Sequence, residues 1–317
     1  GAVPDTDMAM APGTAETADP NDALRRRATL ASVAVALVLI VAKLGAYATT
    51  GSVALLSSLI DSSVDAFASI VTLVGVRYAL QPPDATHRYG HGKGEPLAAT
   101  AQALFIAGSA VLLTYQAISR IVNPEPLRQS WIGIAVMGVS IVLTLVLVAY
   151  QRRVIAKTGS VAITADSLHY SGDLAMNLAV IAAILLAEWT GQTVFDPLFA
   201  IGIALFLLVS AGRIAQHSLD MLMDRELPAD KRRRIREIVM THPETRGVHD
   251  MRTRNAGDRY FIEFHLELDR HLTLEEAHDI TDAVEAEVMA AFPNSEVLIH
   301  QEPEGLEEDR LDRRLRR

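Results

Sequence analysis

Long apolar runs in the first two thirds of the chain constrain its fold more than any other feature of the sequence. A helix needs about 20 consecutive apolar residues to cross the hydrocarbon core of a bilayer. Half of the 317 residues are hydrophobic, and they are concentrated in runs of about this length. We expect six membrane-spanning helices, at residues 29–49, 53–80, 97–122, 131–150, 161–189 and 197–216.

Basic residues at the ends of the runs predict the orientation of the spans. Lys and Arg gather before the first run, between the second and third, and between the fourth and fifth, as Arg25, Arg26, Arg27, Arg88, Lys93, Arg152, Arg153 and Lys157. Because cytoplasmic loops carry an excess of these residues, we expect both termini in the cytoplasm and a multi-pass protein of the inner (cytoplasmic) membrane. Lys43, late in the first run, is expected to snorkel toward the outer interface.

The sequence pattern changes after Asp224. We expect an amphipathic helix at 227–242, two alternating strands joined by a Gly257–Asp258 turn, a helix opened by a Thr273–Glu276 capping box, and a short strand at 295–302. This α-β-β-α-β order predicts a small α+β domain. The expected organisation is a disordered N-terminal tail (1–24), a six-helix transmembrane domain (25–224), a cytoplasmic domain (225–303) and a charged flexible tail (304–317).

Carboxylates stand at depth in only two of the apolar runs. Asp61 and Asp65 are four residues apart in the second, and His169 and Asp173 are four apart in the fifth, so each pair shares one face of its helix. An ionised acid in mid-bilayer costs at least about 2.5–3.5 kcal/mol, and these two runs hold no Lys or Arg near enough to neutralise the acids. A site for a divalent cation or for protons explains the cluster better than helix-packing hydrogen bonds.

The ligand types suggest both a metal and a driving force. One imidazole and three carboxylates suit tetrahedral Zn²⁺ and tolerate Fe²⁺ or Cd²⁺. Metal binds deprotonated ligands, so its arrival releases protons, and His169 is the expected proton carrier. Asp166, one turn nearer the cytoplasm, is either a relay residue or a helix-start acid that faces water.

Two further groups contain His and acidic residues. Asp84, His87 and His91 follow the second run and form either a second metal site or a solvated loop cluster. In the terminal domain, strands and helices could bring together a third metal site, although each histidine alone could be a surface residue. Its candidates are His249, His265, His278, His300 and Glu302.

Composition excludes several function classes. The formal net charge of −9 gives no support to nucleic-acid binding. The chain has no Cys, which excludes a disulfide framework, a thiolate metal site and thiol catalysis. We expect a membrane protein that handles metal ions rather than an enzyme.

These motifs together resemble the cation diffusion facilitator family, and within it the bacterial zinc/ferrous-iron efflux branch (YiiP/FieF type). The resemblance rests on the Asp-x-x-x-Asp and His-x-x-x-Asp of the two spans, on DATHRYGHGKGEPLAA, and on VHDMRTRNAG, FIEFHLELD and LIHQEP. It extends from about Arg27 to Pro303 and implies a homodimeric divalent-metal/proton antiporter that exports metal from the cytoplasm.

The resemblance also implies roles for individual residues. Asp61, Asp65, His169 and Asp173 match the family's membrane transport site, and Asp84, His87 and His91 match its loop site. His249, His265, His278 and His300 match a binuclear site in a metallochaperone-like cytoplasmic domain that contributes to dimerisation. Lys93 and Asp224 match charges that interlock the membrane dimer. Glu302 departs from the family pattern, which has Asp there, and His169 argues against the manganese branch.

Three functions remain to be distinguished. A proton-coupled exporter uses the membrane site for alternating access. A passive metal channel would need weak binding for fast release, which a complete buried ligand set disfavours. A membrane-anchored metal sensor would signal through the terminal domain and has no need of a site within the membrane.

Overall fold

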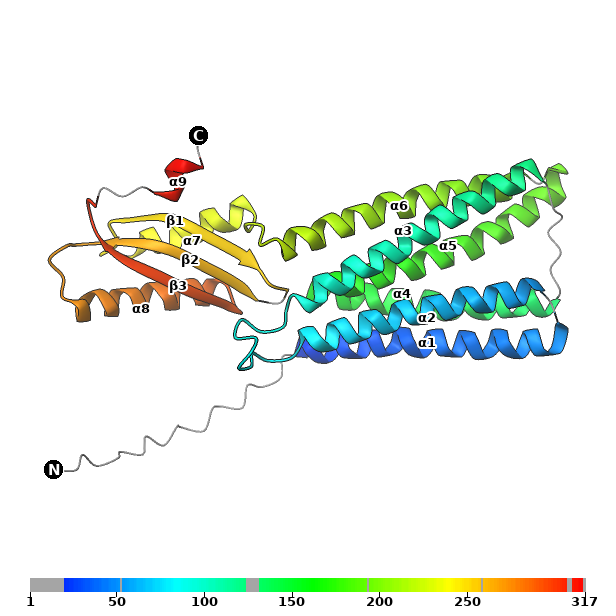
Figure 1. The fold of residues 1–317 in the computed structure, drawn as a ribbon, viewed down its shortest axis with the longest axis horizontal. Coiled ribbons are helices and arrows are strands. Elements are labelled where there is room, and N and C mark those ends of the chain that lie inside the picture. Colours follow the sequence, from blue (N-terminus) through cyan, green and yellow to red (C-terminus); the bar gives the residue numbers. More distant parts are fainter. Residues whose placement is uncertain are drawn as a thin grey trace, which may run out of the picture.

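The computed structural model describes residues 20–51, 53–123, 131–192, 194–257, 259–306 and 310–315. Six long helices lie side by side in an elongated bundle (Figure 1). Each is long and apolar enough to cross a membrane, which confirms the six expected spans. The helices are α1 (Pro20–Thr50), α2 (Val53–Ala79), α3 (Gly94–Val122), α4 (Trp131–Thr158), α5 (Val161–Thr190) and α6 (Phe195–Leu222).

Small residues allow these helices to pack closely. The most extensive helix pair is α3 with α6, while α1 packs against α2 and α4. A Cβ atom on Gly75 of α2 would lie 2.3 Å from the Cβ atom of Ala98 on α3. Glycine is therefore required where these two helices cross, as expected for helix packing in a membrane.

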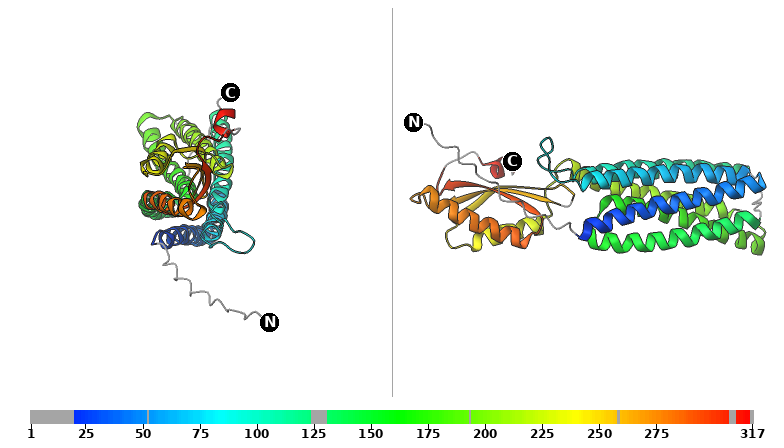
Figure 2. Two further views of the ribbon diagram at one scale, coloured as in Figure 1. Left: turned by 90° about the vertical axis from the view of Figure 1, so that its left-hand side faces the viewer. Right: turned by 90° about the horizontal axis from the view of Figure 1, so that it is seen from below.

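A small α+β domain continues from one end of the bundle (Figures 1 and 2). It contains α7 (Ala229–Thr241), β1 (Gly247–Asn255), β2 (Tyr260–Leu268), α8 (Leu274–Ala291) and β3 (Ser295–Pro303). The sheet order is β1-β2-β3, with β1–β2 antiparallel and β2–β3 parallel. This confirms the predicted α-β-β-α-β order.

One face of the sheet forms the core of this domain. Ile262, Phe264 and Leu266 alternate along β2 and pack with Ile235 of α7 and Val284 of α8. The odd-numbered residues of β2 therefore lie on the opposite face, away from α7 and α8.

Two sequence predictions concern the turns of this domain. The capping box that opens α8 is present, with Thr273 and Glu276 bonding reciprocally through side chain and backbone. The predicted Gly257–Asp258 turn falls partly outside the described residues, because only Gly257 is included.

Both tails differ from the sequence expectation where the structure describes them. Helix α1 begins at Pro20, so residues 20–24 belong to the first helix rather than to a disordered tail, and residues 1–19 lie outside the described part. In the C-terminal tail, Leu311–Arg314 form a short helix, α9. The Asp250 carboxylate accepts the backbone N–H groups of Leu311 at 2.8 Å and Asp312 at 2.9 Å, which holds α9 against β1.

Charged and aromatic side chains join the bundle to the sheet domain. Nζ of Lys93 lies 2.8 Å from Oδ1 of Asp224, and Arg254 of β1 reaches Oδ2 of the same aspartate at 3.5 Å. The Arg254 guanidinium also lies over the rings of Tyr89 and Phe261. The loop between α2 and α3 thus contacts the sheet domain directly.

Candidate functional site

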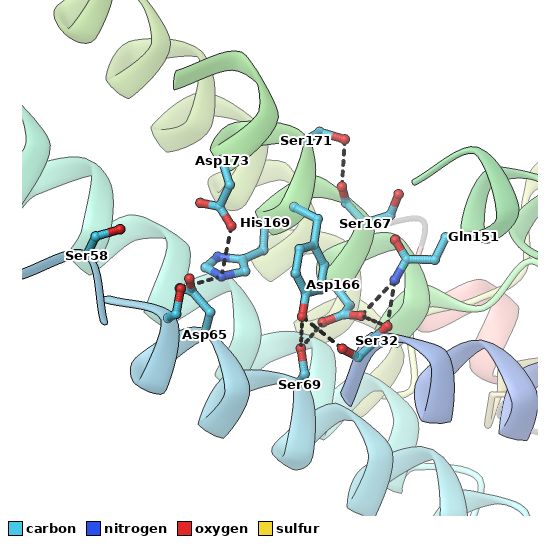
Figure 3. Close-up of polar contacts among 12 residues, drawn as sticks. Ser32, Ser58, Asp65, Ser69, Gln151, Asp166, Ser167, His169, Ser171 and Asp173 are labelled. Atoms are coloured by element: carbon cyan, nitrogen blue, oxygen red, sulfur yellow. Dashed lines mark hydrogen bonds and ion pairs between the residues drawn. The ribbon is translucent and has the colours of Figure 1, made fainter. Parts of the chain in front are cut away.

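Three side chains from α2 and α5 meet inside the helix bundle (Figure 3). Nε2 of His169 lies 2.9 Å from Oδ1 of Asp65 and 3.8 Å from Oδ2 of Asp173. These residues offer ligand atoms that all lie within 4.8 Å of one another. We call Asp65, His169 and Asp173 the membrane triad.

Asp61, the fourth residue predicted for this site, stands one helical turn from Asp65 on α2 and is not part of the triad's ligand group. It lines the same cavity as Asp65 and Asp173, which has a volume of about 160 Å³. The structure thus brings three predicted ligands together and places the fourth in the adjoining wall.

The cavity extends from the triad in one direction only. Its walls come from residues 36–43 of α1, 58–65 of α2, 140–144 of α4 and 170–177 of α5. Following each helix by residue number, these stretches lie between the triad and the end of the bundle opposite the sheet domain. We call this end the distal end.

Packed polar side chains occupy the other side of the triad (Figure 3), which by residue number along the helices is the side of the sheet domain. Oδ2 of Asp166 accepts hydrogen bonds from Ser32 at 2.6 Å and Gln151 at 2.7 Å, and its Oδ1 accepts one from Ser69 at 3.1 Å. Asp166 is 1% exposed. The interpretation of Asp166 as a water-facing acid is therefore wrong, because donors on three neighbouring helices enclose its carboxylate.

Lys43 lies elsewhere than the sequence predicted. Its ammonium donates to Oγ of Ser62 at 2.6 Å and to the backbone oxygen of Ser58 at 3.2 Å. Lys43 lines the cavity beside Asp61 and Asp65, so the predicted snorkelling to the outer interface is wrong. The acids do have a cationic neighbour, supplied by α1 rather than by their own helices.

The loop after α2 gathers its three predicted ligands. Oδ2 of Asp84 lies 3.4 Å from Nε2 of His91, and Oδ1 lies 3.5 Å from Nδ1 of His87. The rings of His87 and His91 are 4.6 Å apart between centroids. His91 is buried while His87 and Asp84 are exposed, so the group forms a compact N/O ligand set at the surface.

Local hydrogen bonds stabilise the ionised form of Asp84. Its Oδ1 accepts the hydroxyl of Thr86 and the backbone N–H groups of Thr86 and His87, each at 2.7 Å. These bonds, that of the Thr86 side chain first, hold the pKa of Asp84 well below its usual range. The carboxylate therefore stays ionised, and Oδ2 faces His91.

Histidines form a row across the face of the sheet that points away from α7 and α8. His249 pairs with His265 in the β1–β2 register, and His265 pairs with His300 in the β2–β3 register. Glu302 touches all three: its Oε2 lies 3.2 Å from His249, its Oε1 lies 3.6 Å from His300, and it contacts Nδ1 of His265. We call these four residues the sheet row.

The sheet row fits a divalent metal by its chemistry. His265, His300 and Glu302 offer ligand atoms within 4.8 Å of one another, and His249, Asp250 and His265 form a second such group. Imidazole nitrogen and carboxylate oxygen are ordinary zinc ligands. Two overlapping groups agree with a site for two ions, and Glu302 reaches both halves despite replacing the expected Asp.

His278 does not join the row within one chain. It is exposed on α8 and lies 3.4 Å from Asp282. Conversely, the sequence prediction missed Glu267, whose Oε1 lies 3.1 Å from Nδ1 of His249. Glu267 is two residues after His265 on β2 and so shares its face of the sheet, which is the signal that could have identified it.

Comparison with known proteins identifies the families of the two parts of the chain. Residues 29–223 match the family described as "Cation efflux transmembrane domain", and residues 227–304 match "Cation efflux protein, cytoplasmic domain". The sheet domain is also similar to the metal-bound C-terminal domain of the CzcD transporter from Thermotoga maritima, with 31% identity over 25% of this chain and 93% of that chain, at a TM-score of 0.24.

Curated relatives match over most of their length. "Cation-efflux pump FieF" of Shewanella oneidensis is 49% identical over 280 residues, which is 88% of this chain and 94% of that protein. The protein of the same name from Cronobacter sakazakii is 46% identical over 277 residues, 87% of this chain and 92% of that protein. The chain therefore belongs to the cation diffusion facilitator family, in its FieF-type branch.

Proposed function

We propose that this protein is a proton-coupled antiporter that exports divalent metal cations from the cytoplasm, with Zn²⁺ as the preferred ion and Fe²⁺ or Cd²⁺ as alternatives. The observation that carries this proposal is the membrane triad inside the bundle, two of whose members, Asp65 and Asp173, line a cavity. Membership of the cation efflux family supports the direction of transport.

The triad suits zinc but needs one more ligand. It supplies one imidazole nitrogen and two carboxylates, whereas zinc is almost always tetrahedral in protein sites. Asp61 is in the cavity wall one turn away on the same helix as Asp65. We propose that Asp61 completes the site in the metal-bound state.

The position of His169 supports the proposed proton coupling. Its Nε2 faces both carboxylates of the triad, so a proton on this nitrogen can be donated to either acid. A metal ion at the same place needs the lone pair of that nitrogen. One atom cannot hold both, so metal binding at Nε2 releases the proton.

Asp166 is the proposed relay between the triad and the cytoplasmic side. It lies one turn from His169 on α5 and on the side of the triad that faces the sheet domain. Its hydrogen bonds to Ser32, Ser69 and Gln151 offer a chain of exchangeable protons. Asp166→Asn should alter the pH dependence of zinc transport while leaving zinc affinity at the triad within about threefold.

We further propose a homodimer in the inner membrane with both termini in the cytoplasm. The sheet domain then faces the metal supply, and the sheet row and the loop site bind metal there. His278, which is exposed on α8, is available to a second subunit. The Lys93–Asp224 pair, at the junction of bundle and sheet domain, is the proposed interlock at the base of the dimer.

Zinc flux in proteoliposomes tests the proposed function. Protein oriented with its sheet domain outside should take up zinc when the vesicle interior is acidic, since protons leave as metal enters. Asp65→Ala removes the partner at 2.9 Å from His169 and should reduce the flux at least about 100-fold. Glu188→Ala, an exposed acid on α5 outside the cavity, is the matched control and should leave the flux unchanged.

The same assay separates the alternatives. A passive channel would carry zinc down its own gradient whatever the pH difference. A membrane-anchored sensor would bind zinc on the sheet domain with no flux at all. Either result in the wild-type protein would exclude the antiporter.

A further inference from the structure

Lys43 places a positive charge in the wall of the transport cavity. Its ammonium bonds to Ser62 and to the backbone of Ser58, both on α2. Ser58, Asp61 and Ser62 share one face of α2, being spaced at i, i+3 and i+4. The ammonium is therefore held on the helical turn that carries Asp61.

This position is unusual for a lysine in a membrane span. A long basic side chain near a helix end normally reaches the interface, because a charge inside the bilayer is costly. In the described part of the chain, both hydrogen-bond partners of Lys43 are neutral oxygens. What favours the charge at this place is the surrounding set of acids, since Asp61, Asp65 and Asp173 line the same cavity.

Charge balance in the cavity indicates a role for Lys43. Three ionised carboxylates with a neutral imidazole leave a surplus of one negative charge when a divalent cation binds. One ammonium balances that surplus. Because charges interact more strongly inside a protein than in bulk water, the ammonium must also weaken the attraction between the acids and the metal.

We infer that Lys43 is a permanent counter-cation of this cavity. Its ammonium interacts with the same carboxylates as the metal, and so lowers zinc affinity enough for the ion to leave toward the distal end. The inference rests on the proposed transport function. A lysine suits this role because it is a compact charge on a flexible stem, and it can follow the acids as metal arrives and departs.

A purely structural role would give a different result. If Lys43 served only to join α1 to α2 through Ser62, its loss would loosen the bundle and weaken zinc binding. A counter-cation predicts the opposite sign, because its removal leaves the acids with more negative charge for the metal. The direction of the change in zinc affinity therefore distinguishes the two roles.

Zinc affinity of the full-length protein in detergent is the primary measurement. Asp84→Ala and His265→Ala are introduced throughout to weaken the loop site and the sheet row, and a zinc-chelating dye provides the competition. Lys43→Gln should bind zinc at least about tenfold more tightly, which corresponds to about 1.4 kcal/mol. Lys43→Met, which has no polar head, should do the same if charge is the cause.

Two controls separate charge from shape. Lys43→Arg keeps the positive charge and should stay within about threefold of the parent affinity. Ser62→Ala removes the bond at 2.6 Å but keeps the charge in the cavity, and should also stay within that range. Unchanged or weaker zinc binding in both neutral variants would overturn the inference, as would an arginine variant that behaves like them.

Transport kinetics provide a second readout. In proteoliposomes the neutral variants should show a lower KM for zinc together with a lower kcat, because tighter binding slows release. An unchanged kcat with a raised KM would contradict the inference. If the parent protein shows no proton-driven flux, the proposed function fails, while the binding comparison still reports on the charge of Lys43.

Discussion

Asp84 shows how a turn can set the charge of a single side chain. Three donors converge on one of its carboxylate oxygens, and they favour the ionised form, which is why its pKa is lowered. The stabilisation of the turn is complete at any pH above the usual aspartate value of about 4. It is lost only as the pH falls from there toward the lowered pKa.

Replacing Thr86 tests this account. Thr86→Val removes the hydroxyl donor, the largest cause of the shift, so the pKa of Asp84 should rise toward its usual value. An NMR titration of labelled aspartate carboxyl carbons measures it. Thr241→Val, which removes a hydroxyl on α7 that bonds only the backbone of Glu237, is the control. An unmoved pKa in Thr86→Val would mean that the backbone N–H groups suffice.

The hydrogen bonds of Asp166 connect several helices of the bundle. Its donors come from α1, α2 and α4, while Asp166 itself belongs to α5. Tyr170 adds to this contact, since its hydroxyl lies 2.8 Å from Oγ of Ser69 and donates to the backbone of Ser32 at 3.2 Å. Helix positions on the sheet-domain side of the triad are thus fixed by directional hydrogen bonds.

Removing this carboxylate should loosen the bundle measurably. Asp166→Ala leaves three donors without their acceptor, and each unpaired buried group costs about 1–3 kcal/mol. We expect the free energy of unfolding to fall by about 3 kcal/mol, measured by thermal or denaturant unfolding in detergent. Glu188→Ala should change it by less than about 0.5 kcal/mol. An unchanged stability in Asp166→Ala would show that water or neighbouring groups replace the carboxylate.

Periodicity and hydropathy were sufficient to predict much of the fold. The six spans and the α-β-β-α-β order follow from spacings of 3.6 and two residues. The i, i+4 pairs on two spans indicated which polar residues to place together, and the structure does bring Asp65, His169 and Asp173 into contact.

Other features depend on how elements are rotated and packed, which periodicity does not report. Lys43 faces the cavity because of the way α1 lies against α2, and no pattern within the first span indicates this. The burial of Asp166 likewise depends on Ser32 and Gln151, which are distant in sequence. The position of α9 depends on Asp250, which adopts a left-handed conformation at φ 48° and accepts the N–H groups of the tail.

At the scale of the whole molecule, the sheet row and the membrane triad lie in separate domains joined by the contacts of Lys93, Asp224 and Arg254. The turn between β1 and β2 also approaches the loop after α2, since a Cβ atom on Gly257 would lie 2.7 Å from the backbone oxygen of Gly92. The sheet domain thus contacts the loop between α2 and α3 at more than one point.

Metal should stabilise the proposed dimer through its sheet domains. In an Asp65→Ala, Asp84→Ala background, zinc at about 100 times its dissociation constant should stabilise the protein by about 2.7 kcal/mol. Thermal unfolding and small-angle scattering should show a higher Tm and a more compact particle. Adding His265→Ala should remove both effects, whereas His271→Ala, at an exposed histidine outside the sheet row, should not. No response to zinc in the background protein would exclude metal-linked dimerisation.

The one-sided cavity has a practical consequence. The chain contains no cysteine, so any thiol introduced into it is the sole target for a maleimide reagent. A cysteine at Asn177, in the cavity wall, would be labelled by reagent that enters the cavity, whereas one at Ser69, which is 0% exposed beside Asp166, would be shielded. The ratio of the two labelling rates would then report to which side of the membrane the cavity is accessible. The measurement works in a native membrane and without any metal present.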